Sequence, residues 1–91
     1  MQPKDVVSPK DRFRLIEVLH TGKDPGDKDY SWSLCLGMWK EPKGPSLVRV
    51  GIRWDGKSNK EKGNPTSHGQ PTWFLLPHEV VDPALVGLQL P

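Results

Sequence analysis

The stretch Leu47-Val48-Arg49-Val50-Gly51-Ile52-Arg53-Trp54-Asp55-Gly56 gives the clearest indication of the fold of this chain. Its even-numbered positions from 48 to 54 are apolar, and the positions between them are arginine or glycine. Successive side chains of a β-strand point to opposite faces of a sheet, so the alternation predicts a strand with one apolar face. We expect the apolar residues to pack inward and Arg49 and Arg53 to face outward.

Three other segments have the composition of strands. Residues 11–21 carry apolar residues at both parities, and a helix is the alternative interpretation there. Residues 30–40 alternate, and the turn at residues 41–46 joins them to the central stretch, which predicts an antiparallel hairpin. Residues 71–76 return to apolar character after a polar run at residues 55–72. The whole pattern predicts four short strands.

The remaining parts of the chain suggest short helical turns and a loose start. Pro77 is suited to open one helical turn, and Asp82-Pro83 followed by Gly87 is suited to open and stop a second. Residues 1–10 are polar, contain two prolines and predict a flexible arm, which leaves a single β domain over residues 11–88.

Ten prolines and nine glycines in 91 residues predict many short elements and disfavour a helical bundle. Four short strands with a dominant hairpin and a terminal helical turn resemble the general plan of SH3-like barrels and β-rolls of four to five strands. The resemblance is architectural and implies an all-β antiparallel fold. No family-specific motif accompanies it, so it implies no function.

Charge and cysteine content restrict the function classes. The net charge is only +2, with acids and bases mixed along the chain, which argues weakly for nucleic acid. Cys35 is the single cysteine, so an intramolecular disulfide or a cysteine-based zinc site is excluded, and we expect a small buried hydrophobe. The chain shows neither the apolar run of a signal peptide nor a membrane span, so we expect a cytoplasmic protein with no membrane partner.

No pattern in the sequence predicts catalysis, a metal site or a cofactor. The letters from Gly51 to Ser58 match a phosphate-binding loop, but they include a predicted strand and precede no helix, so we interpret the match as accidental. Ser67 and His68 are neighbours in sequence, which does not supply the geometry of a nucleophile and its base. His20, His68 and His78 are scattered over three segments. We therefore predict that the protein is not an enzyme.

The most promising binding surface is the predicted second face of the hairpin, where Arg49 and Arg53 border Ser33, Cys35 and Gly37. Two arginines spaced by two on one strand lie ~6.6 Å apart and can grip neighbouring carboxylates. The alternative is a solvent face on which the arginine stems cover Trp39 or the arginines pair with Glu17. The polar run at residues 55–72 is either a ligand-contacting flap or a mobile connector. The candidate binding residues are Trp39, Arg49, Arg53, Lys57, Asn64, Ser67 and His68.

These observations favour a small β-domain that acts as a protein-interaction or homo-oligomerising module. One alternative is a single-stranded nucleic-acid-binding domain, because basic residues interleave with Trp39, Trp54 and Trp73. The other alternative is small-ligand binding in a cleft between subunits, because a small barrel is nearly filled by its own side chains.

Overall fold

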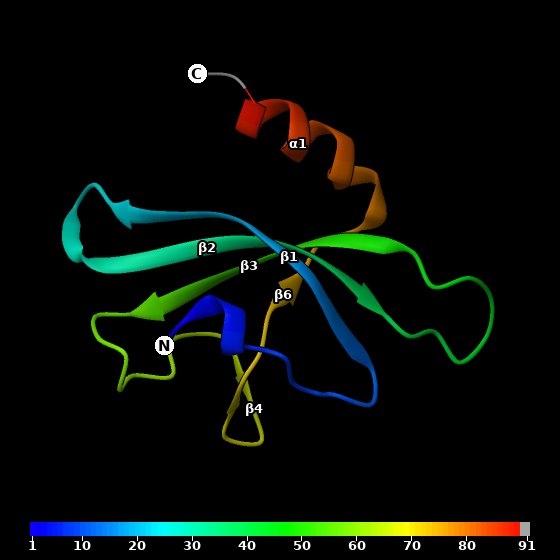
Figure 1. Ribbon diagram of the computed structural model, residues 1–91, viewed down its shortest axis with the longest axis horizontal. Coiled ribbons are helices and arrows are strands. Elements are labelled where there is room, and N and C mark those ends of the chain that lie inside the picture. The colour runs from blue at the N-terminus through cyan, green and yellow to red at the C-terminus, as the bar shows by residue number, and fades with distance from the viewer. Residues whose placement is uncertain (90–91) are drawn as a thin grey trace.

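The computed structural model describes residues 1–89, and its main feature is a four-stranded antiparallel sheet in the order β1-β2-β3-β6 (Figure 1). The strands of this sheet are β1 (Phe13–Asp24), β2 (Asp27–Trp39), β3 (Val48–Gly56) and β6 (Phe74–Leu75). A second, two-stranded sheet consists of β4 (Thr66–Ser67) and β5 (Gln70–Pro71). The helical elements are η1 (Pro3–Asp5), η2 (His78–Val80) and α1 (Val81–Gln89). The fold is mostly β.

Each of the four predicted strand segments overlaps a strand of the main sheet, although β1 extends to Asp24 and β2 begins at Asp27, beyond the predicted bounds. A strand rather than a helix occupies the first of them, and only Pro25 and Gly26 separate β1 from β2. The predicted antiparallel hairpin of β2 and β3 is confirmed. The strand β3 continues to Gly56 with no helix after it, as expected for an accidental match to a phosphate-binding loop. The small hairpin of β4 and β5, inside the polar run, was not predicted.

The C-terminal helix is longer than the single turn expected over Asp82–Gly87, because α1 passes through Gly87 and reaches Gln89. Packing supports the added length, since both η2 and α1 contact β3. The contact between η2 and β3 is polar: His78 Nδ1 lies 2.7 Å from the carbonyl oxygen of Val48. Among residues 1–89, no helix has the length and apolar character needed to cross a membrane.

The described strands do not close into a barrel, so the SH3-like barrel is not confirmed. The molecule measures 41 × 35 × 16 Å. Figure 1 shows α1 on one side of the sheet and η1 with the β4 hairpin on the other. We call the side of η1 the inner face and the side of α1 the outer face. The inner face carries Ser33, Cys35, Gly37, Gly51 and Arg53; the outer face carries Trp32, Leu34, Val50, Ile52 and Trp54.

The hydrophobic core lies on the inner face and is formed by Val6, Phe13, Cys35 and Trp73. Small residues in the sheet permit this packing, because a Cβ atom on Gly37 would lie 2.5 Å from Cε1 of Phe13. The sequence predicts a flexible arm at residues 1–10, whereas the structure buries Val6 completely. The carbonyl oxygen of Val6 also accepts a hydrogen bond from Trp73 Nε1 at 2.8 Å. The arm is therefore part of the core.

The predicted facing of β3 is wrong. Arg53 is 3% exposed on the inner face, whereas Ile52 and Trp54 are 39% and 43% exposed on the outer face. The physical reason is that the large side chains of the core come from other segments and require a floor of small residues. The apolar residues of β3 therefore lie on the outer face of the sheet, away from that core. Only Val50 among them is fully buried, at the end of β3 that η2 and α1 contact.

Candidate functional site

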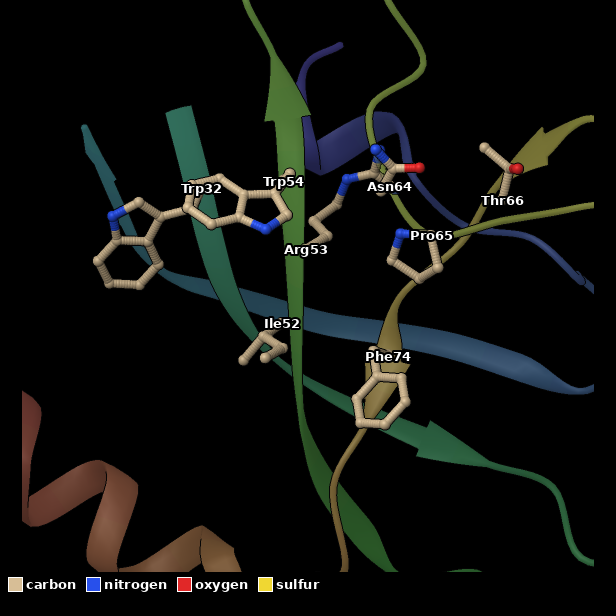
Figure 2. A pocket seen from close by; sticks show the side chains of 8 residues that line it. All are labelled: Trp32, Ile52, Arg53, Trp54, Asn64, Pro65, Thr66 and Phe74. Carbon is tan, nitrogen blue, oxygen red and sulfur yellow. The ribbon is translucent and has the colours of Figure 1, made fainter. Parts of the chain in front are cut away.

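An open groove of about 680 Å³ lies on the part of the outer face that the helix leaves uncovered. Figure 2 shows its lining side chains projecting from β2, β3, β6, β4 and the segment just before β4. We call it the aromatic groove. It is lined by Trp32, Ile52, Arg53, Trp54, Asn64, Pro65, Thr66 and Phe74.

Strand register places the apolar residues of the groove side by side. Trp32 of β2 is the register partner of Trp54 of β3, so the two indoles are cross-strand neighbours on one face. Ile52 is the register partner of Phe74. Trp54 and Asn64 exchange two backbone N–H···O hydrogen bonds of 2.8 Å each, which fixes the Asn64 side of the groove to β3.

Neighbouring residues hold the rings of Trp32 and Trp54 in place. Trp32 lies over Gly22, where an added Cβ atom would be 2.9 Å from the indole. The centroids of the His20 and Trp32 rings are 5.1 Å apart. Tyr30 and Trp54 meet edge to face with centroids 5.5 Å apart, an arrangement that aromatic pairs favour. The groove therefore has rings held in place without a ligand.

The surface of the groove is mainly apolar, because its most exposed side chains are apolar and its one charged residue points away from it. Phe74 is 58% exposed, more than either Ile52 or Trp54. Since an aromatic side chain presents ~150–250 Å² of surface, Trp54 and Phe74 each leave roughly 100 Å² in solvent. The single charged residue among the described lining residues is Arg53, and its guanidinium is directed into the inner face.

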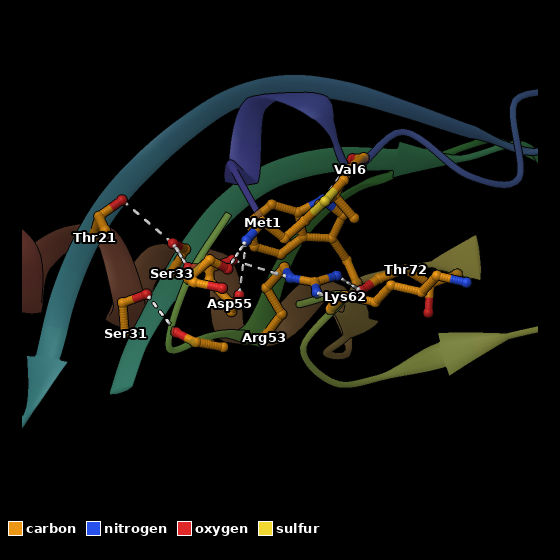
Figure 3. A network of polar contacts seen from close by, with 12 residues as sticks. Met1, Val6, Thr21, Ser31, Ser33, Arg53, Asp55, Lys62 and Thr72 are labelled. Atoms are coloured by element: carbon orange, nitrogen blue, oxygen red, sulfur yellow. Dashed lines mark hydrogen bonds and ion pairs between the residues drawn. The ribbon is translucent and has the colours of Figure 1, made fainter. Parts of the chain in front are cut away.

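That guanidinium belongs to a buried polar network (Figure 3). Arg53 Nε donates to Asp55 Oδ1 at 3.1 Å, and Nη1 donates to the carbonyl oxygen of Thr72 at 2.6 Å. Nη2 donates to the carbonyl oxygen of Lys62, and Asp55 Oδ2 accepts the hydroxyl of Ser33. Burial lowers the pKa of the Arg53 guanidinium, an effect that Asp55 opposes. The network thereby attaches the chain after β3 to the inner face.

The buried hydrogen-bonding groups of this network are all paired. Within residues 1–89, every fully buried side-chain nitrogen or oxygen atom has a hydrogen-bond partner. The Ser33 hydroxyl is committed to Asp55 and lies 3.3 Å from the hydroxyl of Thr21. We therefore assign the network a structural role. It keeps Asn64 and Pro65 beside β3, where they complete the aromatic groove.

The structure separates the candidate binding residues that sequence reasoning proposed. Asn64 lies in the aromatic groove. Trp39 and Arg49 line a second depression of about 440 Å³, where Arg49 Nη2 is 3.5 Å from Glu41 Oε1. Arg53 is internal, so the proposed outward pair of arginines is wrong. An arginine that has a carboxylate two positions along its own strand can be paired internally, which is the reason for the error.

The remaining proposed residues lie outside the aromatic groove. Lys57 is exposed, with its Nζ 3.2 Å from Asp27 Oδ2 and 5.9 Å from the centroid of the Tyr30 ring. Ser67 and His68 are exposed in the small hairpin of β4 and β5, where His68 has a φ of 50°. They do not meet the groove.

Sequence reasoning missed the groove because it assigned Ile52 and Trp54 to the core. A signal was present in the sequence. The alternating positions of residues 32–38 and 48–54 make a larger apolar face than one short C-terminal helix covers.

The described part of the chain holds no group of three or more His, Cys, Asp or Glu side chains placed to bind a metal ion. Cys35 is buried as expected, and burial raises the pKa of its thiol to about 12. No protein-family model matches the chain, and the comparisons with curated proteins and with solved structures give no match.

Proposed function

We propose that the protein is an interaction module that binds a segment of another protein in the aromatic groove. The observation that carries the proposal is the exposure of Ile52, Trp54 and Phe74 together on the part of the outer face that α1 leaves uncovered. Contiguous apolar patches of this kind on a small domain are characteristic of interaction sites.

The energy available in the groove fits a weak, reversible contact. Burying the roughly 200 Å² that Trp54 and Phe74 expose contributes about 5 kcal/mol at ~25 cal/mol per Å². Association itself costs at least about 4 kcal/mol, so further contacts to Trp32 and Pro65 are needed for a stable complex. The rings are already held in place, which reduces the entropy lost on binding.

Self-association through the same groove is the second form of this proposal. A stable dimer usually buries ~800 Å² on each partner, and Trp54 and Phe74 together expose roughly 200 Å². A short segment needs less area than a second folded copy. We therefore favour a segment of a different protein.

The other two function classes have less support. Nonspecific single-strand binding combines stacking rings with a positively charged track, and Arg53, the one cationic residue among the described lining residues, is internal. The groove is complete within one chain, so a small-ligand cleft between subunits is not needed to explain it.

Selection of random displayed peptides against the native protein tests the proposal. The groove variant carries Trp54→Gln and Phe74→Gln. The matched control carries Leu47→Gln and Val86→Gln, which remove two exposed apolar side chains outside the groove. We expect selected peptides to bind the control like the native protein and to bind the groove variant at least about 30-fold more weakly, the loss typical of hot-spot residues.

Two results would overturn this proposal. One is that selection yields no binding peptide, and the other is that the peptides bind the groove variant as tightly as the native protein. The solution mass, measured from micromolar to millimolar protein concentration, then distinguishes binding of another protein from self-association. An increase in mass that the groove variant abolishes would assign the groove to self-association.

A further inference from the structure

We propose that the aromatic groove recognises a proline-rich segment in the extended polyproline conformation, with a lysine or arginine at the end that passes Asp24. This inference rests on the proposed function and names the class of partner. It follows from the backbone pairing, the size, the hydrogen-bonding groups and the charge of the groove.

Backbone pairing argues against an added β-strand. The N–H and the carbonyl of Trp54 are both bonded to Asn64, and Ile52 is paired with Phe74 of β6. The edge of β3 beside the groove is therefore occupied by the chain itself. A partner segment that lies across the rings must bind through side-chain contacts and cannot extend a ladder of backbone hydrogen bonds from β3.

The size of the groove suits a short extended segment. The groove holds about 680 Å³. A polyproline segment has no internal hydrogen bonds and extends ~3.1 Å per residue, so a few residues fit along the rings. Such a segment is already extended before binding and loses little entropy.

The hydrogen-bonding groups of the groove complement proline. A proline residue has a carbonyl acceptor and no N–H donor. Within residues 1–89, the indole N–H groups of Trp32 and Trp54 make no hydrogen bond, whereas the indole of Trp73 donates to Val6. The amide of Asn64 adds another donor at the groove. Flat aromatic faces pack against proline rings, while the indole donors satisfy the carbonyls between them.

The charge of a neighbouring cavity favours a cationic residue at one end of the bound segment. A cavity of about 400 Å³ adjoins the groove at Trp54 and is also lined by Asp24, Asp27, Tyr30 and Asn64. Lys57 pairs with Asp27, whereas Asp24 has no ion pair within the described residues. A cationic side chain on the bound segment therefore has a carboxylate available beside the ring of Tyr30.

Titration of the full chain with synthetic peptides tests this inference by NMR of the indole N–H groups. The probes are octaproline with lysine at either end, the same peptides with glutamate, and a glycine-serine peptide with lysine. We expect submillimolar binding of a lysine–octaproline peptide, with shifts of the Trp32 and Trp54 indole signals. The buried Trp73 signal is an internal control that moves only if the fold changes.

Two substitutions separate the ring contacts from the charge. Trp54→Gln should weaken the lysine peptide about 30-fold, as expected for a hot-spot aromatic. Asp24→Asn should weaken it roughly twofold to fivefold, the range for one exposed ion pair, and should not weaken the glutamate peptide. The matched control is Asp82→Asn, an exposed acid on α1 away from the groove, which should change neither affinity.

The outcomes distinguish this inference from the proposed function. If octaproline peptides cause no shift at Trp32 and Trp54, or bind no better than the glycine-serine peptide, the proline inference is overturned. Displayed peptides that depend on Trp54 and Phe74 but lack proline would overturn the inference and retain the proposed function. Self-association that is lost in Trp54→Gln but unchanged on replacing the exposed Pro42 and Pro45 by alanine would assign the groove to a second copy and overturn the inference.

Discussion

Replacing Arg53 with methionine tests the reversed facing of β3, on which the aromatic groove depends. Methionine approximately preserves the length of the aliphatic stem and removes the guanidinium. Asp55, which is 2% exposed, would then remain in the interior with the Ser33 hydroxyl as its side-chain partner. The carbonyl oxygens of Thr72 and Lys62 would lose the donors that Arg53 supplies.

The expected loss of stability is large for a chain of this size. Removing one partner of a buried ion pair costs about 3–5 kcal/mol, because the other charge stays buried. A domain of this length has a free energy of unfolding of roughly 5–15 kcal/mol, so the variant would retain a fraction of the native value. Adding Asp55→Asn removes the unpaired charge. The double variant should therefore be more stable than the sum of the two single losses predicts.

Urea unfolding followed by tryptophan fluorescence measures these losses. Arg49→Met is the matched control, because Arg49 occupies the same face of β3 but is only half-buried, with its contact to Glu41 at 3.5 Å. That substitution should cost at most about 1 kcal/mol, as for exposed ion pairs.

Equal, small losses for Arg53→Met and Arg49→Met would refute the reasoning. Such a result would mean that the guanidinium of Arg53 is in water. The apolar side of β3, with Ile52 and Trp54, would then be the core. The aromatic groove and both proposals that use it would be withdrawn.

Three further predictions test the packing of the fold. Burial raises the pKa of the Cys35 thiol from 9.0 to about 12, so the unfolded chain loses this proton first, and the thiol's contribution to stability falls as pH rises above 9.0. Urea midpoints on either side of pH 9.0 should fall more for the native protein than for Cys35→Ala. Gly37→Ala should destabilise by about 1–3 kcal/mol, because its Cβ would meet Phe13, whereas Gly87→Ala meets no neighbour and should stabilise α1 by up to about 1 kcal/mol. Trp54→Gln should lower the unfolding midpoint only slightly, since Trp54 is largely exposed and its edge-to-face ring contact is worth about 0.5–1.5 kcal/mol.

Local sequence signals were sufficient to locate the strands of the main sheet, but not the small hairpin of β4 and β5. Alternation at residues 48–54 and the Pro25-Gly26 turn are features of the chain itself, and the structure has strands and a turn there. The same signals did not determine the length of α1. A helix that contains Gly87 depends on its contact with β3, which is not apparent from helical propensity alone.

The side of the sheet that faces the core depends on distant segments. Val6 and Trp73 cover the inner face, and they lie outside the three long strands. Alternation shows that a strand has two different faces, but it does not show which face the rest of the chain covers. The narrow stripe of Ser33, Cys35, Gly37 and Gly51 is in retrospect the informative feature, because aromatic side chains can approach a backbone only over small residues.

The exposed groove follows from a simple comparison of lengths. The nine residues of β3 span ~30 Å, whereas the nine residues of α1 span ~14 Å. One such helix covers less than half of a strand that is apolar along its outer face. The covered end is at Val50, and the uncovered end is at Ile52 and Trp54. A chain that places its other large side chains on the inner face therefore leaves this apolar surface exposed, and this is the surface that the proposed interaction would cover.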